Sequence, residues 1–203
     1  MIAVSHPTGN AFVRALLAGL ESEKRLARFF TTIAGVGRRR YPVPAERIDT
    51  SPLREMARLA LARFGAPLTR HETGWASVDG VYRALDAHVA RWMANERPAI
   101  DWVYAYEDGA LATFRAAREL GIRRAYELPI AYWETAQRLL REEAERLPEW
   151  EPTLGATRDS EAKLTRKTEE ITMADKVICP SRFVFESLPE ETRARAVIVP
   201  FGS

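Results

Sequence analysis

The sequence predicts an α/β domain in which helices cover both faces of a mostly parallel sheet of six or seven strands. Short apolar and β-branched runs alternate with windows whose apolar residues recur at helical spacing, a pattern typical of such sheets. The chain has 203 residues, of which 46% are hydrophobic, which is enough for a full core in one folded body. We therefore expect a single Rossmann-like, three-layer α/β/α domain over residues 1–203.

Strands are predicted wherever a short run of β-branched, aromatic or other apolar residues is bounded by turn-forming residues. The turn His6–Asn10 follows the first run, and Gly35–Gly37 ends the second. Pro42 and Pro44 disfavour both a helix and a central strand, so residues 38–50 are expected to be irregular. The expected strands are residues 2–5, 26–34, 101–106, 123–127, 176–179 and 196–199.

Helices are predicted between these strands from apolar stripes and from capping residues. Ser51 is a hydroxyl N-cap followed by Pro52, which favours a helix start, and Gly65 is the expected stop. Two successive helices occupy the crossover before the strand at 101–106, and residues 101–127 form a βαβ unit with parallel strands. The expected helices begin near residues 10, 51, 78, 109, 132, 159 and 182.

Composition and charge exclude several classes of protein. A single cysteine cannot form an internal disulfide, and with only three histidines the chain has little material for a structural zinc site, so no metal is predicted. The start of the chain lacks the pattern of a signal peptide, and nowhere do 18 apolar residues follow one another. We expect a soluble, cytoplasmic protein with no nucleic-acid partner and with Cys179 as a small buried side chain.

The net charge of +2 hides an asymmetry along the chain. Residues 1–70 carry 12 basic and 5 acidic side chains, whereas the rest of the chain carries 18 and 23. The excess of positive charge is compatible with an anionic ligand or with peripheral contact at the inner face of an anionic membrane. The simpler interpretation is a soluble protein whose surface charges segregate.

Candidate binding residues follow from the rule that ligands of open parallel sheets bind outside the carboxyl ends of the strands. The turn after the first strand places Gly9 and free backbone N–H groups at a helix start, where a phosphate or a sugar hydroxyl is readily held. The glycine could also serve only the backbone of the turn. Arg38 and Arg39 could bind a phosphate through bidentate contacts, or could lie in a solvated loop.

Three carboxylates follow the middle strands. Glu107 and Asp108 could accept hydrogen bonds from sugar hydroxyls or act as a general base, although Asp108 could instead cap the next helix. Glu127 is a further ligand candidate, with a salt bridge to a nearby arginine as the alternative. The chain has no dinucleotide fingerprint, no P-loop and no nucleophile elbow, which argues against the commonest NAD, ATP and hydrolase classes.

The last thirty residues carry the most specific sequence pattern in the chain. Residues 174–181 (ADKVICPS), 182–188 (RFVFESL) and 197–202 (VIVPFG) follow one another at fixed spacing. This pattern resembles the end of the N-terminal domain in family 4 of the retaining GT-B glycosyltransferases. Residues 101–121 and the Gly9 turn look similar too, so the resemblance spans the whole chain.

The resemblance implies a transfer of sugar from a nucleotide sugar to an acceptor, between two Rossmann-like domains that face a cleft. The N-terminal domain of such enzymes mainly binds the acceptor, and its glycine turn lies near the donor phosphates. No cofactor is implied beyond the nucleotide sugar, which is a co-substrate. The residues implied are Glu107, Asp108 and Glu127 for the acceptor, Gly9 and Asn10 for the donor phosphates, and His6, Arg38, Arg39 and Ser181 as further candidates.

Two departures from the family pattern affect the prediction. Members of the family often carry a histidine after the fourth or fifth strand, but residues 106–108 and 127–129 contain none, so no catalytic residue is assigned. The C-terminal, donor-binding domain is expected to be absent, because residues 201–203 fall where the linker would begin. The chain would then be the acceptor-binding half of a glycosyltransferase that transfers a sugar to a carbohydrate or lipid-linked acceptor. This half would need a donor-binding domain to act.

Other functions stay open at this point. One is a stand-alone α/β binding or scaffolding protein that uses its cleft for a ligand or a partner chain. Another is a nucleotide-dependent epimerase, for which the glycine-rich fingerprint is missing. Exposed apolar surface near residues 199–201 would favour the half-enzyme, because a docking partner would cover it.

Overall fold

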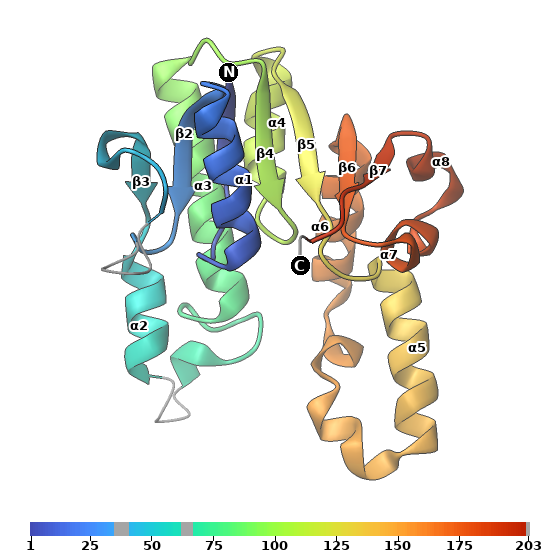
Figure 1. The fold of residues 1–203 in the computed structure, drawn as a ribbon. Helices are drawn as coiled ribbons and strands as arrows, with labels where there is room; N and C mark the ends of the chain where they lie inside the picture. Colours follow the sequence, from blue (N-terminus) through green and yellow to red (C-terminus); the bar gives the residue numbers. More distant parts are fainter. Residues whose placement is uncertain (35–40, 62–66, 202–203) are drawn as a thin grey trace.

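A computed structural model describes residues 1–34, 41–61 and 67–201 of the chain. Seven parallel strands form one sheet in the order β3-β2-β1-β4-β5-β6-β7 (Figure 1). This confirms the predicted α/β class and the predicted number of strands. The strands are β1 (Ile2–Ser5), β2 (Leu26–Thr31), β3 (Ile48–Thr50), β4 (Trp102–Tyr106), β5 (Arg123–Glu127), β6 (Lys176–Cys179) and β7 (Ala196–Ile198).

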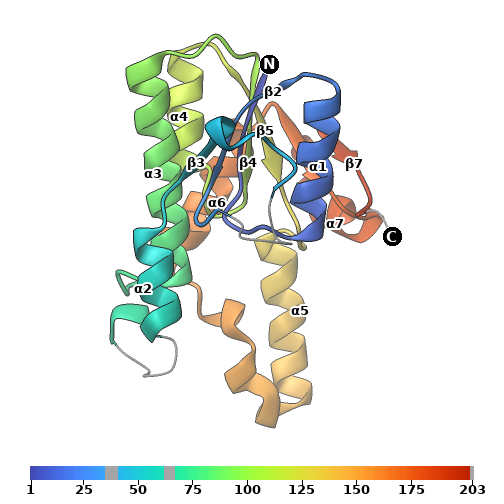
Figure 2. The same cartoon turned by 60° about the vertical axis from the view of Figure 1, so that its left-hand side comes forward.

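Helices cover both faces of this sheet. Helices α3, α4 and α6 lie on one face and α1 on the other, while α2 and α5 extend past the carboxyl ends of the strands (Figures 1 and 2). Val184 of α7 packs in the same core cluster as α3, α4 and α6. The α-helices are α1 (Ala11–Ser22), α2 (Leu53–Leu61), α3 (Val78–Glu96), α4 (Leu111–Glu119), α5 (Trp133–Arg146), α6 (Glu161–Met173), α7 (Arg182–Ser187) and α8 (Glu190–Arg193). Short 3-10 helices are η2 (Ala45–Arg47), η3 (Pro67–Thr69), η4 (Pro148–Thr153) and η5 (Gly155–Arg158).

The prediction for residues 38–50 was wrong, because strand β3 lies within them. Ile48 pairs with Phe29 and Thr50 with Thr31, which makes β3 the outer strand beside β2. Pro42 and Pro44 precede this strand and therefore remove no donor from its ladder. The second strand ends at Thr31 rather than at residue 34. The expected stops at Gly35–Gly37 and Gly65 lie outside the described residues.

The core divides along the two faces of the sheet because successive strand residues point to opposite sides. In β4, Val103 and Ala105 pack into the larger cluster with α3, α4 and α6. Tyr104, between them, packs with Val4 and α1 on the other face. Cys179 is fully buried in the larger cluster, as predicted. Within the described residues, no helix is both long and apolar enough to cross a membrane.

Two buried carboxylates cap the start of α4. Glu170 of α6 accepts hydrogen bonds from the backbone N–H groups of Ala110 (3.1 Å) and Leu111 (3.2 Å). Asp86 of α3 accepts from the next two N–H groups, both at 2.8 Å. These carboxylates satisfy donors that a helix start leaves free. The alternative role of Asp108 as the cap was therefore wrong, since distant residues supply the caps.

Candidate functional site

The strand order reverses between β1 and β4, which is where ligands bind in open α/β sheets. His6 follows β1 directly, and Tyr106 is the last residue of β4. Their rings pack edge to face, with centroids 4.5 Å apart. Tyr106 is also paired in register with Glu127, the last residue of β5. The switch point thus gathers side chains from three strand ends.

His6 and Glu127, two of the predicted candidates, lie against each other at this point. The His6 Nε2 atom is 3.6 Å from the Glu127 Oε2 atom, and the two residues are only 1% and 7% exposed. The other ring nitrogen, Nδ1, lies 3.1 Å from the backbone N–H of Thr8 and 2.8 Å from its carbonyl oxygen. Nε2 has no hydrogen-bond partner among the described residues. A buried polar atom of this kind points to a functional role or to a missing partner.

A cavity of about 380 Å³ opens beside Glu127 on the α1 face of the sheet. Glu127 and Tyr104 supply its acidic carboxyl and its phenol, and the rest of the lining is apolar. Burial raises the pKa of Tyr104 far above its ordinary value, and the Glu127 carboxylate raises it further. The phenol therefore stays protonated at neutral pH. The apolar lining comes from Ala11, Phe12, Val13, Ala15, Leu16, Ile178, Pro180, Val199, Pro200 and Phe201.

The predicted phosphate turn lies at the start of α1. Asn10 is the N-cap, because its Oδ1 atom accepts a hydrogen bond from the N–H of Val13 at 2.9 Å. Gly9 lies against Tyr41, so closely that an added Cβ atom would be 2.6 Å from the phenol oxygen. Thr8, Gly9 and Asn10 are all exposed. A role for Gly9 and Asn10 toward phosphates stays a prediction, and each residue has a structural function as well.

Glu107 and Asp108 contact α6, on the opposite face of the sheet from the cavity. Lys167 Nζ lies 2.7 Å from Glu107 Oε1 and 3.2 Å from Asp108 Oδ2, and Arg166 lies 3.2 Å from Asp108 Oδ1. Burial raises the pKa of Glu107, although Lys167 opposes this. Burial alone would lower the pKa of Lys167, but the two carboxylates outweigh it and raise that pKa. Their proposed contact with an acceptor stays a prediction.

Ser181, a further candidate, is not part of the cavity lining. Ser181 is the N-cap of α7, where its hydroxyl oxygen accepts from the N–H of Val184 at 3.3 Å. Arg38 and Arg39 lie outside the described residues. Away from the strand ends, His71, Glu72 and Asp159 bring ligand atoms within 4.8 Å of one another. Two of these groups already have partners, since Lys163 binds Asp159 and the N–H of Ser160 binds Glu72.

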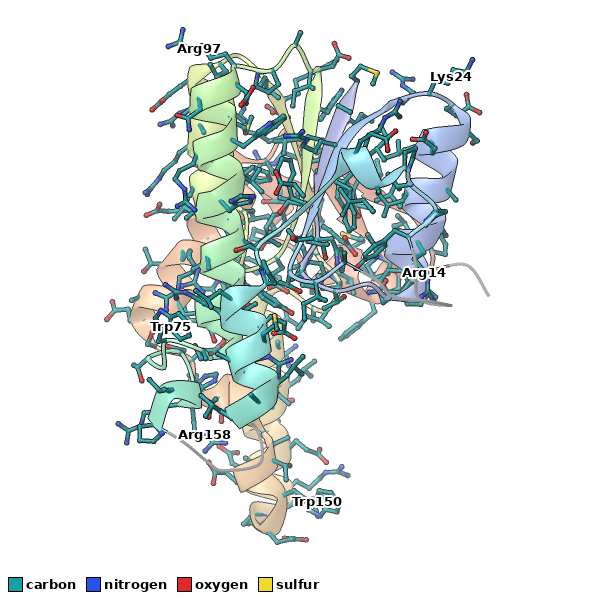
Figure 3. The ribbon with its side chains drawn as sticks, turned by 90° about the vertical axis from the view of Figure 1, so that its left-hand side faces the viewer. Arg14, Lys24, Trp75, Arg97, Trp150 and Arg158 are labelled. Carbon is teal, nitrogen blue, oxygen red and sulfur yellow. The ribbon has the colours of Figure 1, made fainter. Side chains whose placement is uncertain are left out.

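Tyr104 and Arg14 were missed by sequence reasoning. Tyr104 shares a strand face with Tyr106, two residues on, and this alternation could have placed it beside Glu127. Arg14 lies in the first turn of α1 (Figure 3). It has no ion pair with any residue that the structure describes. A cation at this position adds to the positive end of the helix dipole.

Comparison with known proteins identifies the fold but no family. No protein-family model matches the chain, and no curated protein matches it. The solved structure of Phytolacca americana UGT2, complexed with UDP-2fluoro-glucose and pterostilbene, is 12% identical to this chain with a TM-score of 0.57. The match covers 100% of this chain and 52% of the UGT2 chain. The structure of TcCGT1 in complex with UDP is 14% identical with a TM-score of 0.58, covering 99% and 50%.

A third similar structure comes from a different class of enzyme. A protein of Listeria monocytogenes assigned as a UDP-N-acetylglucosamine 2-epimerase is 13% identical with a TM-score of 0.53, covering 96% of this chain and 43% of its own. At such low identity these similarities show the fold alone: the chain shares its α/β fold with the parts of these structures that it matches. The chain spans about half the length of the solved structures that it matches.

Proposed function

We propose that the chain is the acceptor-binding half of a retaining, nucleotide-sugar-dependent glycosyltransferase that acts on a carbohydrate or lipid-linked acceptor. The observation that carries this proposal is the apolar cavity with the Glu127 carboxylate and the Tyr104 phenol beside the switch point. Its volume of about 380 Å³ suits a ligand of moderate size. The fold shared with nucleotide-sugar enzymes supports the reaction class.

Glu127 would orient the acceptor. A carboxylate accepts hydrogen bonds only, so it would receive a hydrogen bond from an acceptor hydroxyl. The Tyr104 hydroxyl also donates to Glu127 and would help to hold this carboxylate in place. The apolar walls would hold a hydrophobic part of the acceptor. In the transfer, a bond forms between the acceptor oxygen and the anomeric carbon as the bond from that carbon to the diphosphate breaks. The nucleoside diphosphate leaves with the electron pair, and the acceptor proton passes to its departing oxygen, so a retaining transfer needs no separate base.

The start of α1 would face the donor phosphates. Backbone N–H groups and the positive end of a helix dipole favour an anion at such a position. Thr8, Gly9 and Asn10 are exposed there, and Arg14 supplies a cation without an ion pair among the described residues. The same turn connects to the cavity, because Ala11 and Phe12 belong to the cavity lining.

An exposed apolar strip supports docking of a donor-binding domain. Val197, Ile198, Val199 and Phe201 are 39% to 52% exposed, and β7 is the outer strand of the sheet. Phe201 stacks on Phe12 of α1, with ring centroids 4.0 Å apart. Apolar side chains gathered in this way mark an interaction surface. The donor-binding domain could follow in the same chain or be a second protein.

Acceptor binding is tested with octyl β-glucoside, which combines sugar hydroxyls with an apolar tail. We expect backbone NMR shifts at Tyr104, Glu127 and the first half of α1. Glu127→Gln should weaken binding about ten-fold, because a hydrogen bond to a charged group is lost. Glu134→Gln, an exposed carboxylate of α5, serves as the matched control and should leave binding unchanged. Shifts confined to Val197 and Ile198, which do not line the cavity, together with binding that Glu127→Gln leaves unchanged, would refute the acceptor site.

The transferase activity is tested from the coding sequence after residue 203 and from the neighbouring frames. A domain there with a nucleotide-sugar site should, when produced with this chain, transfer a sugar from one of a panel of UDP-sugars. Loss of that transfer in Glu127→Gln, but not in Glu134→Gln, would link the activity to the cavity. If no such domain is encoded nearby, the stand-alone binding protein becomes the better explanation.

A further inference from the structure

Helix α2 exposes an apolar side that nothing in the described chain covers. Leu53, Met56 and Leu59 are 70%, 60% and 53% exposed, and no residue of this helix is buried. A surface helix of a globular protein normally packs its apolar stripe on the core. In α2 the stripe is exposed instead. The helix lies at the part of the molecule that extends past the carboxyl ends of the strands (Figures 1 and 2).

The same surface continues onto η3 and the start of α3. Leu68, Trp75 and Val78 are 41% to 50% exposed, which adds three more large apolar side chains. Figure 3 views this side, with α2 in front of the lower part of α3 and Trp75 in the loop beside them. We call this surface the α2–α3 face, defined by Leu53, Met56, Leu59, Leu68, Trp75 and Val78 together with Arg54, Arg70, Arg83 and Arg91.

The four arginines of the α2–α3 face are not neutralised by carboxylates of the described residues. Arg54 donates to the backbone oxygens of Trp75 (3.2 Å) and Gly80 (3.1 Å) and lies over the Trp75 ring at 5.2 Å. Arg83 also donates to two backbone oxygens. Arg70 and Arg91 are exposed, and their side chains have no described partner. The face therefore keeps its positive charge.

Charge and apolar area meet in one hollow of about 470 Å³. Leu53 and Trp75 line it together with Arg54, Arg83 and Arg91. The neighbouring Arg58 contributes no free charge, because Glu55 binds it at 2.6 Å and 2.7 Å. Three guanidinium groups thus surround apolar side chains, so an occupant must offer negative charge next to apolar groups.

We infer that the α2–α3 face docks on an anionic lipid membrane. A bilayer surface presents anionic headgroups directly above acyl chains, which matches arginines mixed with exposed leucine, methionine and tryptophan. A free phosphate would use the arginines but leave the apolar side chains in water. The inference is independent of the proposed transferase activity.

The charged part of the inference is tested by flotation with two kinds of vesicle, phosphatidylcholine alone and phosphatidylcholine mixed with phosphatidylglycerol. The protein should bind the mixed vesicles, and added salt should weaken that binding. Each arginine near a membrane contributes roughly five-fold in affinity, so the triple variant Arg70→Gln, Arg83→Gln, Arg91→Gln should bind on the order of 100-fold more weakly. The matched control is the triple variant Arg25→Gln, Arg118→Gln, Arg182→Gln, whose exposed arginines lie on other elements and whose affinity should fall far less.

The apolar part is tested with Leu53→Ser combined with Met56→Ser. Both side chains are largely exposed, so this variant should keep its unfolding free energy and still lose membrane binding. The control is Ile130→Ser with Phe183→Ser, which are each 57% exposed elsewhere on the protein. A control pair that loses as much membrane binding would refute the location of the docking face.

Three other results would overturn the inference. Equal binding to neutral vesicles, or an equal loss in both arginine triples, would exclude a specific electrostatic contact. Competition by free glycerol phosphate would indicate a soluble anion site instead of a membrane. Dimerisation that Leu53→Ser with Met56→Ser abolishes would identify a second copy as the occupant. Octyl β-glucoside binding should persist in all of these variants, so failure here leaves the Glu127 proposal unaffected.

Discussion

Replacing Gly9 with alanine should destabilise the protein through one contact. The new Cβ atom would lie 2.6 Å from the Tyr41 phenol oxygen and 3.0 Å from the ring carbon that carries it. The Tyr41 ring has little freedom to move away, because it packs on Phe29 with centroids 4.7 Å apart and its hydroxyl lies 3.3 Å from Thr31 Oγ1. Forcing an extra carbon into a packed site costs ~1–3 kcal/mol, and we expect about 2 kcal/mol here.

The assay is urea denaturation, and the chain provides its own matched control. Gly19 lies in α1 with no atom within 4 Å of an added Cβ, so Gly19→Ala should stabilise the protein by ~0.5–1 kcal/mol through helix propensity. Tyr41→Phe removes the nearest atom and leaves the ring carbon at 3.0 Å. In that background Gly9→Ala should cost about half as much, a coupling that a double-mutant cycle measures.

Two results would refute this reasoning. One is a Gly9→Ala protein whose unfolding free energy equals that of the natural protein. The other is a cost that Tyr41→Phe does not reduce, since the strain would then lie in the backbone of the turn and not against the tyrosine. If Gly9→Ala kept its stability and lost nucleotide-sugar binding in a complete enzyme, the glycine would serve the ligand alone.

Two further changes test the buried charges and the pH response. Lys167→Met should lower the free energy of unfolding by ~3–5 kcal/mol, because it leaves Glu107 buried without its partner. Lys167→Met combined with Glu107→Gln should recover much of that loss. As the control, Lys176→Met changes an exposed lysine and should alter stability little in the same urea assay. The Arg124 guanidinium lowers the pKa of Asp175, so this carboxylate stabilises the folded state above its unfolded pKa of about 4, and the contribution is lost as pH falls through the lower folded pKa. Asp175→Asn should therefore reduce stability at pH 7 by under ~1 kcal/mol, as expected for a partly exposed pair. The difference in stability between this variant and the natural protein should disappear in acid. A difference that persists there would contradict the ion-pair explanation.

The candidate site was only partly predictable, because the amino-acid sequence does not show which strands pair with each other in the sheet. The position of Glu127 at a strand end identified it as a ligand candidate, and the structure places it in the cavity lining. Its contact with His6 depends on β1 and β5 flanking β4, which follows from strand order. Glu107 follows a strand in the same way, yet its side chain contacts Lys167, sixty residues further along.

Local sequence determined the elements, and tertiary structure decided which face each polar side chain serves. Apolar periodicity and capping residues located seven of the eight α-helices among the described residues, all except α8, and six of the strands, because those signals act over a few residues. Strand β3 was not predicted, since its three residues become a strand only by pairing with β2. The caps of α4 come from Asp86 and Glu170, and the exposure of α2 depends on which helices pack over the sheet. Contacts between distant residues depend on packing geometry, which no local pattern encodes.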